Sequence, residues 1–167
     1  SQTTGILKAV LLEEGELTNH RTAAAGALAA KLLAPKEIKK IGIVGAGVQA
    51  RLQASYLRKV TNCRDLTIWG RNSDKAEHAA KDLTELGFNC TVSSEISNLT
   101  QESNLIVTTT PSINPLITEG MIKPGTHITA MGSDTKEKCE ISTSILALAD
   151  IVSTCLLYTS DAADEED

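Results

Sequence analysis

Short apolar runs rich in β-branched residues alternate along the chain with longer stretches of helix-forming residues. Strands are predicted at residues 40–44, 65–69, 90–92, 104–109, 126–131 and 150–152. Helices are predicted at residues 21–33, 48–57, 73–86, 95–101 and 144–149. Because strands and helices alternate, we predict an α/β fold: a Rossmann-type doubly wound parallel sheet with helices on both faces.

The first strand of this sheet ends in a glycine turn, Gly45-Ala46-Gly47, and a helix follows at once. Gly45 allows the tight turn, Gly47 lets a pyrophosphate approach the backbone, and Ala50 keeps helix and strand close. The helix N-terminus then faces the negative charge. The pattern predicts a dinucleotide site that uses Gly45 and Gly47, and the alternative is an ordinary strand-to-helix turn.

The end of the second strand reports which dinucleotide is bound. An acidic residue there would bind the ribose 2′-hydroxyl of NAD, whereas an arginine accommodates the 2′-phosphate of NADP. The chain has Arg71, with Asn72 and Ser73 as neutral donors, and no acid before Asp74. These residues favour NADPH over NADH, unless Arg71 is simply a solvated loop residue.

The fourth and fifth strands end in polar residues, Thr110 and Asp134. Ligands of open α/β sheets bind at the carboxyl ends of the strands, near the switch in strand order. Thr110 is therefore placed to touch the ribose or nicotinamide, although its run of threonines also fits plain β-propensity. Asp134 is a candidate proton shuttle beside the nicotinamide, and the alternative is a turn or capping aspartate.

Outside this domain the two ends of the chain follow other patterns. Residues 5–12 predict a strand, a turn follows at 13–16, and Leu17 begins a return strand, so residues 1–18 look like the remnant of a truncated domain. The dinucleotide-binding domain spans residues 19–154. Residues 155–167 resemble the translation of a sequencing-library adapter, and we treat them as a non-native tail; the alternative is a genuine acidic, disordered tail.

The helix predicted at residues 21–33 is capped by Thr18 or Asn19, which places Arg21 in its first turn. A cation there opposes the helix dipole, which points to an anion nearby. A surface arginine without a role is the alternative.

Composition narrows the function classes. The net charge is −5, and five of the 21 acidic residues lie in the last seven positions; the other 16 match the 16 lysines and arginines. This balance predicts no nucleic-acid partner, and the most apolar run is too short to cross a membrane. The isolated cysteines suit a reducing cytoplasm, and neither cysteines nor histidines show metal-ligand spacing. His127 is expected to be a strand residue.

Three stretches together resemble the ornithine cyclodeaminase/mu-crystallin family, over residues 5–153. They are Leu17-Thr18-Asn19-His20-Arg21-Thr22-Ala23-Ala24, Gly45-Ala46-Gly47-Val48-Gln49-Ala50 and Met131-Gly132-Ser133-Asp134-Thr135-Lys136-Glu137-Lys138-Cys139-Glu140. The residues at 69–71 and 108–112 look most like the ectoine-utilisation branch.

The resemblance implies roles for particular residues. Arg21 matches an arginine that reaches both the substrate carboxylate and the cofactor, and Asp134 matches the proton donor and acceptor. Cofactor contacts are implied for Val48, Gln49, Thr110, Met131, Gly132, Ser133 and Lys138. The implied reactions are deaminating cyclisation of ornithine, reduction of cyclic ketimines and interconversion of alanine and pyruvate, each with NAD(P).

Departures from the family pattern shape the expected function. Most of the family's substrate domain, through which its members dimerise, would lie upstream of Ser1, so we expect this fragment to be inactive alone. Members that recycle NAD usually carry an acid where this chain has Gly70-Arg71, which favours an NADPH-dependent imine reductase acting on an amino acid or imino acid. The alternatives are deaminating cyclisation, a non-catalytic NADPH-binding protein of the mu-crystallin type, and a generic Rossmann module.

Overall fold

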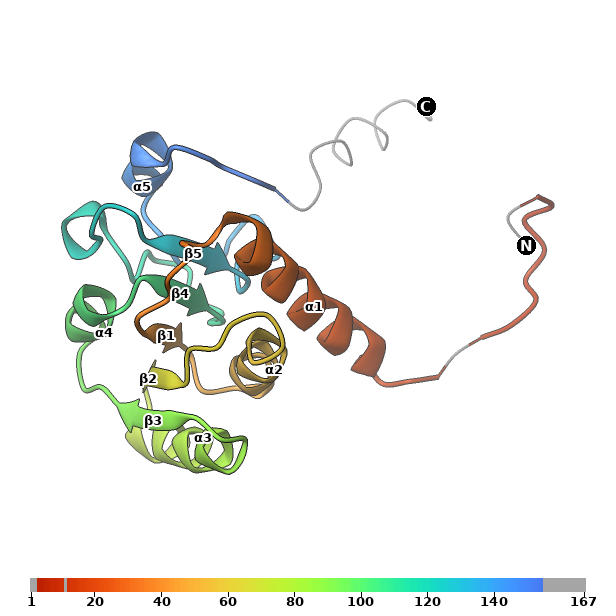
Figure 1. Ribbon diagram of the computed structural model, residues 1–167. Helices are drawn as coiled ribbons and strands as arrows, with labels where there is room; N and C mark the ends of the chain where they lie inside the picture. The colour runs from red at the N-terminus through yellow and green to blue at the C-terminus, as the bar shows by residue number, and fades with distance from the viewer. Residues whose placement is uncertain (1–2, 11, 155–167) are drawn as a thin grey trace.

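The computed structural model describes residues 3–10 and 12–154, which form one five-stranded parallel sheet flanked by helices (Figure 1). In chain order the elements are α1 (Glu16–Leu33), β1 (Ile41–Val44), α2 (Val48–Leu57), β2 (Asp65–Trp69), α3 (Ser73–Glu85), β3 (Asn89–Val92), α4 (Ile96–Glu102), β4 (Leu105–Thr108), the 3₁₀ turn η1 (Glu119–Met121), β5 (His127–Ala130) and α5 (Thr143–Leu148). The predicted Rossmann-type fold class is confirmed.

The strands lie in the order β3-β2-β1-β4-β5, and every neighbouring pair is parallel. The chain moves outward from β1 through β2 to β3, then crosses to the other side of β1 to form β4. The switch in strand order therefore falls between β1 and β4. In open α/β sheets the ligand crevice lies at such a switch, outside the carboxyl ends of the strands.

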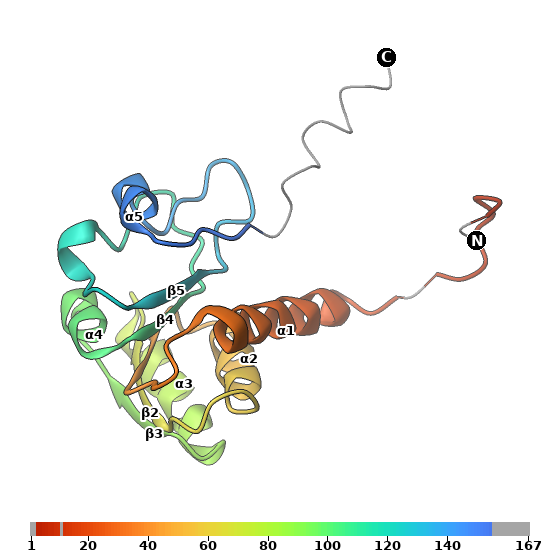
Figure 2. The ribbon, with the colours of Figure 1, turned by 45° about the horizontal axis from the view of Figure 1, so that its top comes forward.

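Alternating strand residues feed two separate cores. On one face Ile41 and Ile43 of β1 pack with alanines and leucines of α1, α2 and α3. On the other face Val44 of β1 packs with Leu99 of α4 and Ile145 of α5. Both views show this division, with α1 and α2 side by side and α4 and α5 apart from them (Figure 2). A sheet buried on both faces explains the continuous apolar strand β1.

The N-terminal segment is the main correction to the predicted fold. Residues 5–10 and 12 form no strand, and Leu17 lies in helix α1 and starts no return strand. A turn at Glu14 and Gly15, both with positive φ, leads straight into that helix. A strand needs a partner to satisfy its backbone groups, and the described part of the chain offers none beside this segment. Its side chains are exposed; Leu12, for example, is 92% exposed.

Other elements also differ from the prediction. Helix α1 begins at Glu16, five residues early, so Arg21 lies in its second turn and the dipole argument loses its force. The cap of α3 is Asn72, whose side chain accepts a hydrogen bond from the Lys75 amide, and Ser73 is the first helical residue. The predicted strand at 150–152 is absent, since these residues are exposed and pair with no neighbour in the sheet.

Helix α1 has 18 residues and packs against α2. Its buried positions are small residues such as Ala23 and Gly26, which let α2 approach closely. None of the helices within residues 3–10 and 12–154 is long and apolar enough to span a bilayer.

Close packing of β1 against α4 gives a first test. An added Cβ at Gly42 would lie 2.8 Å from Ser103 Oγ and would also clash with the Leu99 side chain, whereas at Gly120 it would meet nothing within 4 Å. We expect Gly42→Ala to lower the free energy of unfolding by about 1–3 kcal/mol through overpacking. Urea denaturation of the chain measures this, with Gly120→Ala as the matched control that stays near wild type. Equal stability of the two variants would contradict this packing.

Candidate functional site

The predicted site residues gather at the carboxyl edge of the sheet. Gly45 follows β1, Arg71 follows β2, Thr110 follows β4 and Met131 follows β5. The ends are joined by hydrogen bonds: the Gly45 amide donates to the Trp69 carbonyl, and the Met131 amide donates to the Thr108 carbonyl. Parallel strands and one switch in their order thus bring four distant stretches of sequence together.

The glycine turn has the shape expected of an anion site. Gly45 has a φ of 124°, and an added Cβ would lie 3.0 Å from the Thr109 carbonyl oxygen, so a side chain has no room. At Gly47 an added Cβ would meet nothing within 4 Å, which leaves open space before α2. No side chain caps α2 and its first turn has no acid. Its first amide groups are therefore available to a pyrophosphate.

Arg51 supports this turn, a role that the sequence reasoning missed. Its Nη1 donates to the carbonyl oxygens of Ala46 (2.8 Å) and Gly47 (3.2 Å), and its Nε pairs with Asp82 of α3 at 2.6 Å. Arg51 thus holds both loop carbonyls from the helix side. An arginine four residues after the second glycine was the available signal, but its partner Asp82 is distant in sequence.

The end of β2 lies directly beside the glycine turn. An added Cβ at Gly70 would be 3.0 Å from the Ala46 Cβ, so glycine permits this approach. Arg71 is exposed and follows immediately. Asn72 is also exposed, but its Oδ1 caps α3, which leaves only its amide hydrogens for a ligand. Arg71 therefore brings a cation to this part of the carboxyl edge of the sheet.

Polar side chains join α1 to the start of α2. Gln49 Nε2 donates to the Asn19 carbonyl (3.1 Å) and side chain (3.2 Å). The buried Gln53 donates to the Thr22 carbonyl at 3.2 Å, and its Oε1 has no hydrogen-bond partner. These bonds place the exposed Arg21 in the turn of α1 that lies beside the first turns of α2. They also occupy the Gln49 side-chain amide, predicted to contact the cofactor.

The ends of β4 and β5 meet at Glu140, a buried carboxylate. Its Oε1 accepts hydrogen bonds from the Thr110 amide (2.5 Å) and hydroxyl (2.8 Å). Its Oε2 accepts from the Thr108 hydroxyl and the Gly132 amide, both at 2.7 Å. The Glu140 amide in turn donates to Ser133 Oγ at 3.2 Å. Sequence reasoning gave Glu140 no role, since an acid in a polar loop usually faces solvent.

Asp134 lies on the exposed loop beyond β5, where Lys138 pairs with it at 2.5 Å. The Lys138 side chain holds the pKa of Asp134 below its ordinary value, chiefly through this hydrogen bond. Asp134 is therefore a carboxylate at neutral pH. His127 is confirmed as a strand residue; it lies at the opposite end of β5, and burial lowers its pKa.

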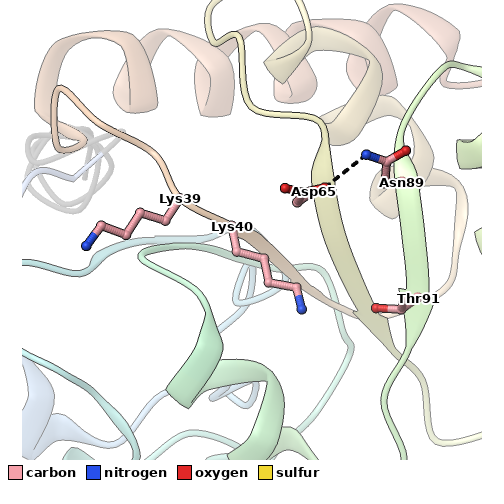
Figure 3. A pocket seen from close by; sticks show the side chains of 5 residues that line it. All are labelled: Lys39, Lys40, Asp65, Asn89 and Thr91. Carbon is pink, nitrogen blue, oxygen red and sulfur yellow. Dashed lines mark hydrogen bonds between the residues drawn. The ribbon is translucent and has the colours of Figure 1, made fainter.

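Two hollows lie at the other, amino-terminal edge of the sheet. One, of about 230 Å³, is lined by Lys39, Lys40, Asp65, Asn89 and Thr91, and the Asn89 side chain bonds Asp65 there (Figure 3). The other, of about 260 Å³, lies near Ser103 and Lys123. Neither contains a predicted site residue. We place the site at the carboxyl edge, because that edge has the glycine turn and the switch in strand order.

Comparison with known proteins identifies the family of this chain. A model of the ornithine cyclodeaminase/mu-crystallin family matches residues 1–164. The chain belongs to this family. An uncharacterized cyclodeaminase of Sinorhizobium fredii, y4tK, is 41% identical over 152 residues, which are 90% of this chain and 46% of that protein. The family resemblance inferred from the sequence motifs is confirmed.

Two solved structures of the family are similar to this chain. The iminosuccinate reductase of Paracoccus denitrificans in complex with NAD⁺ has a TM-score of 0.77 and 36% identity, with 82% of this chain and 42% of that chain covered. An archaeal alanine dehydrogenase dimer with bound NAD has a TM-score of 0.77 and 32% identity, with 83% and 43% covered. The chain thus spans less than half the length of these family members.

The ion pair at Asp134 gives a second test. We expect Lys138→Gln to raise the pKa of Asp134 toward its ordinary value, because the substitution removes the cation that stabilises the carboxylate. The side-chain carboxyl carbon signal of Asp134, followed by NMR as the pH is lowered, measures the midpoint. Lys136→Gln, at an exposed lysine of the same loop, is the control and should leave the midpoint unchanged. An unchanged midpoint in Lys138→Gln would contradict the ion pair.

Proposed function

We propose that this chain is the nicotinamide-dinucleotide-binding part of an enzyme that reduces an imino acid at Cα with NADPH. The observation that carries the proposal is the uncapped N-terminus of α2 behind the open Gly47, with Arg71 beside it at the end of β2. The chain belongs to the family, and the two similar solved structures contain NAD or NAD⁺. Both findings support a nicotinamide cofactor. Arg71 in place of an acid supports the preference for NADPH.

The residues at the carboxyl edge fit such a cofactor. The turn from Gly45 to Gly47, with the backbone of Val48 and Gln49, would hold the pyrophosphate, and Arg71, Asn72 and Ser73 the adenosine ribose and its phosphate. Thr110, Met131, Gly132, Ser133 and Lys138 would line the nicotinamide half. The nicotinamide ring supplies the hydride when it is bound.

Asp134 and Arg21 would act on the substrate. An imine accepts hydride best when its nitrogen is protonated, and the carboxylate of Asp134 suits that positive charge. The lowered pKa of Asp134 keeps the carboxylate available at neutral pH. Arg21 would hold the substrate carboxylate, for which a guanidinium offers two parallel hydrogen bonds.

Deaminating cyclisation of a diamino acid is the second reaction that this site would support. The family name and the cyclodeaminase y4tK favour it. Deaminating cyclisation regenerates its cofactor in each turnover, and it would be accompanied by a preference for NADH over NADPH. Nothing in the comparisons supports the non-catalytic binding protein, because the relatives described above are named as enzymes.

We further propose that the longer protein is a cytoplasmic homodimer. The alanine dehydrogenase structure is a dimer, and this chain spans 43% of it. In α1 the side chains of Leu28 and Leu32 are 56% and 69% exposed, which suits a surface that further protein covers. Three cysteines in the described residues, Cys63, Cys90 and Cys139, form no disulfide, as suits a reducing compartment.

Cofactor preference is tested by titrating the chain with NADPH and with NADH. Trp69, the single tryptophan, ends β2 beside the proposed adenosine site, so bound cofactor should quench its fluorescence. We expect tighter binding of NADPH, and Arg71→Ala should weaken NADPH binding about tenfold with little effect on NADH. Lys81→Ala, at an exposed lysine of α3, is the control for lost positive charge. Preference for NADH would exclude the role of Arg71 and favour deaminating cyclisation.

The role of Asp134 beside the imine nitrogen is tested in the full-length protein that contains this chain. Asp134→Asn should lower kcat by at least about 100-fold, because the variant lacks the negative charge that stabilises the protonated imine, while cofactor affinity stays near wild type. Oxidation of NADPH with a panel of imino acids measures the rate. Asp150→Asn, at another exposed aspartate, should keep full activity. Full turnover in Asp134→Asn would remove Asp134 from the mechanism.

A further inference from the structure

We propose that Glu140 is a positioning residue that fixes the nicotinamide half of the site by joining the ends of β4 and β5. The inference rests on the proposed function, since it assumes that a dinucleotide lies at the carboxyl edge. It adds a residue to that site which does not itself touch cofactor or substrate.

Glu140 is completely buried and accepts four hydrogen bonds through its carboxylate. Two donors come from Thr110, one from Thr108 at the end of β4, and one from Gly132 just beyond β5. None of the ion pairs within residues 3–10 and 12–154 includes Glu140. A buried carboxylate without a cation depends on such hydrogen bonds, so its geometry is tightly constrained.

The backbone around Glu140 is anchored as well. Its carbonyl accepts hydrogen bonds from the amides of Leu116 (2.8 Å) and Ile117 (3.2 Å). Ile141, which directly follows Glu140, forms a parallel β-bridge with Ile117. Ile117 belongs to the core that also contains Leu99 and Ile145. The carboxylate therefore extends from a fixed backbone toward the two strand ends.

The loop of Glu140 also carries the proposed catalytic residue. Ser133 receives a hydrogen bond from the Glu140 amide, and Asp134 follows Ser133 directly. Gly132 cannot bear a side chain here, because an added Cβ would lie 2.6 Å from Glu140 Oε1. Glu140 therefore sets the spacing between Thr110, after β4, and the start of the Asp134 loop, after β5.

This arrangement changes what Thr110 and Gly132 can offer a ligand. Both amide hydrogens and the Thr110 hydroxyl hydrogen already point to Glu140. These two residues are thus held in place by Glu140 and are not free to donate hydrogen bonds to a cofactor. They would contact the nicotinamide half through van der Waals packing and through their oxygen atoms, which can still accept hydrogen bonds.

Glu140→Gln is the sharpest substitution, because it keeps the size of the side chain. Each carboxylate oxygen of Glu140 accepts one backbone amide, from Thr110 or from Gly132. Whichever way the glutamine amide is turned, its NH₂ group faces one of these N–H groups, and that donor is left buried without a partner. The threonine hydroxyls can rotate, but a backbone amide cannot.

The experiment compares the two halves of the cofactor by titrating the chain and following Trp69 fluorescence. Adenosine 2′,5′-bisphosphate probes the glycine turn and the end of β2, and NADPH probes the whole site. Glu140→Gln should bind NADPH about tenfold more weakly, whereas its affinity for adenosine 2′,5′-bisphosphate stays within about twofold of wild type. Thr108→Val, which removes one hydroxyl from Glu140 and keeps the shape of the strand, should weaken NADPH binding about threefold in the same selective way.

Glu137→Gln, at an exposed acid of the same loop, is the matched control and should bind both ligands as wild type does. If Glu140→Gln does not fold, Thr108→Val decides the question. Wild-type affinity for NADPH in Glu140→Gln or, failing that, in Thr108→Val would overturn the inference. So would a parallel loss of both ligands, which indicates a general structural role. If the wild-type chain bound neither ligand, the proposed function would fail first, and the inference with it.

Discussion

The turn between β1 and α2 has no space for a side chain at Gly45, and the rest of the site depends on this constraint. With a φ of 124°, Gly45 lies against the Thr109 backbone at the end of β4. The turn therefore packs the end of β1 against the end of β4, the two strands at the switch in strand order. It also directs the uncapped start of α2 toward the space that Gly47 leaves open. In Rossmann-type folds a dinucleotide binds where these two features coincide, which is the basis of the proposed site.

Two sets of polar contacts hold the surroundings of this turn in place, one on each side. On the α1 side, Gln49 and Gln53 bind the backbone of α1, and on the other side Glu140 joins β4 to β5. Both sets use buried polar groups, whose hydrogen bonds are costly to leave unmade. These hydrogen bonds hold the separate loops at the carboxyl edge of the sheet at fixed distances from one another.

Much of the fold could be predicted because its signals are local. Residues 65–69 and 48–57 were predicted with the bounds of β2 and α2, since apolar runs and glycine breaks mark them clearly. The described residues 5–10 and 12 do not form the strand expected at residues 5–12, because a strand depends on a partner that the local pattern does not report. For the same reason residues 150–152 form no sixth strand.

The sequence predicted which residues lie at the carboxyl ends of the strands, but it did not predict which polar residues hold them in place. The glycine turn and the polar residues after each strand lie where the parallel sheet directs them. Glu140 was missed because its partners are distant in sequence; 32 residues separate it from Thr108. Arg51 was missed because Asp82, which pairs with its side chain, is 31 residues away. The roles given to all the site residues, Arg21, Asp134 and Lys138 among them, stay predictions. The tail at 155–167 lies outside the described residues, and its assignment also stays a prediction.

The most direct test is to find which edge of the sheet binds the cofactor. Backbone amide signals of the isotopically labelled chain can be compared by NMR before and after addition of NADPH. We expect the largest changes at 45–49, 70–73, 109–110 and 131–133, and none around the hollow at Lys40, Asp65 and Asn89. Changes gathered around that hollow, with the glycine turn unaffected, would contradict a dinucleotide site at the carboxyl edge.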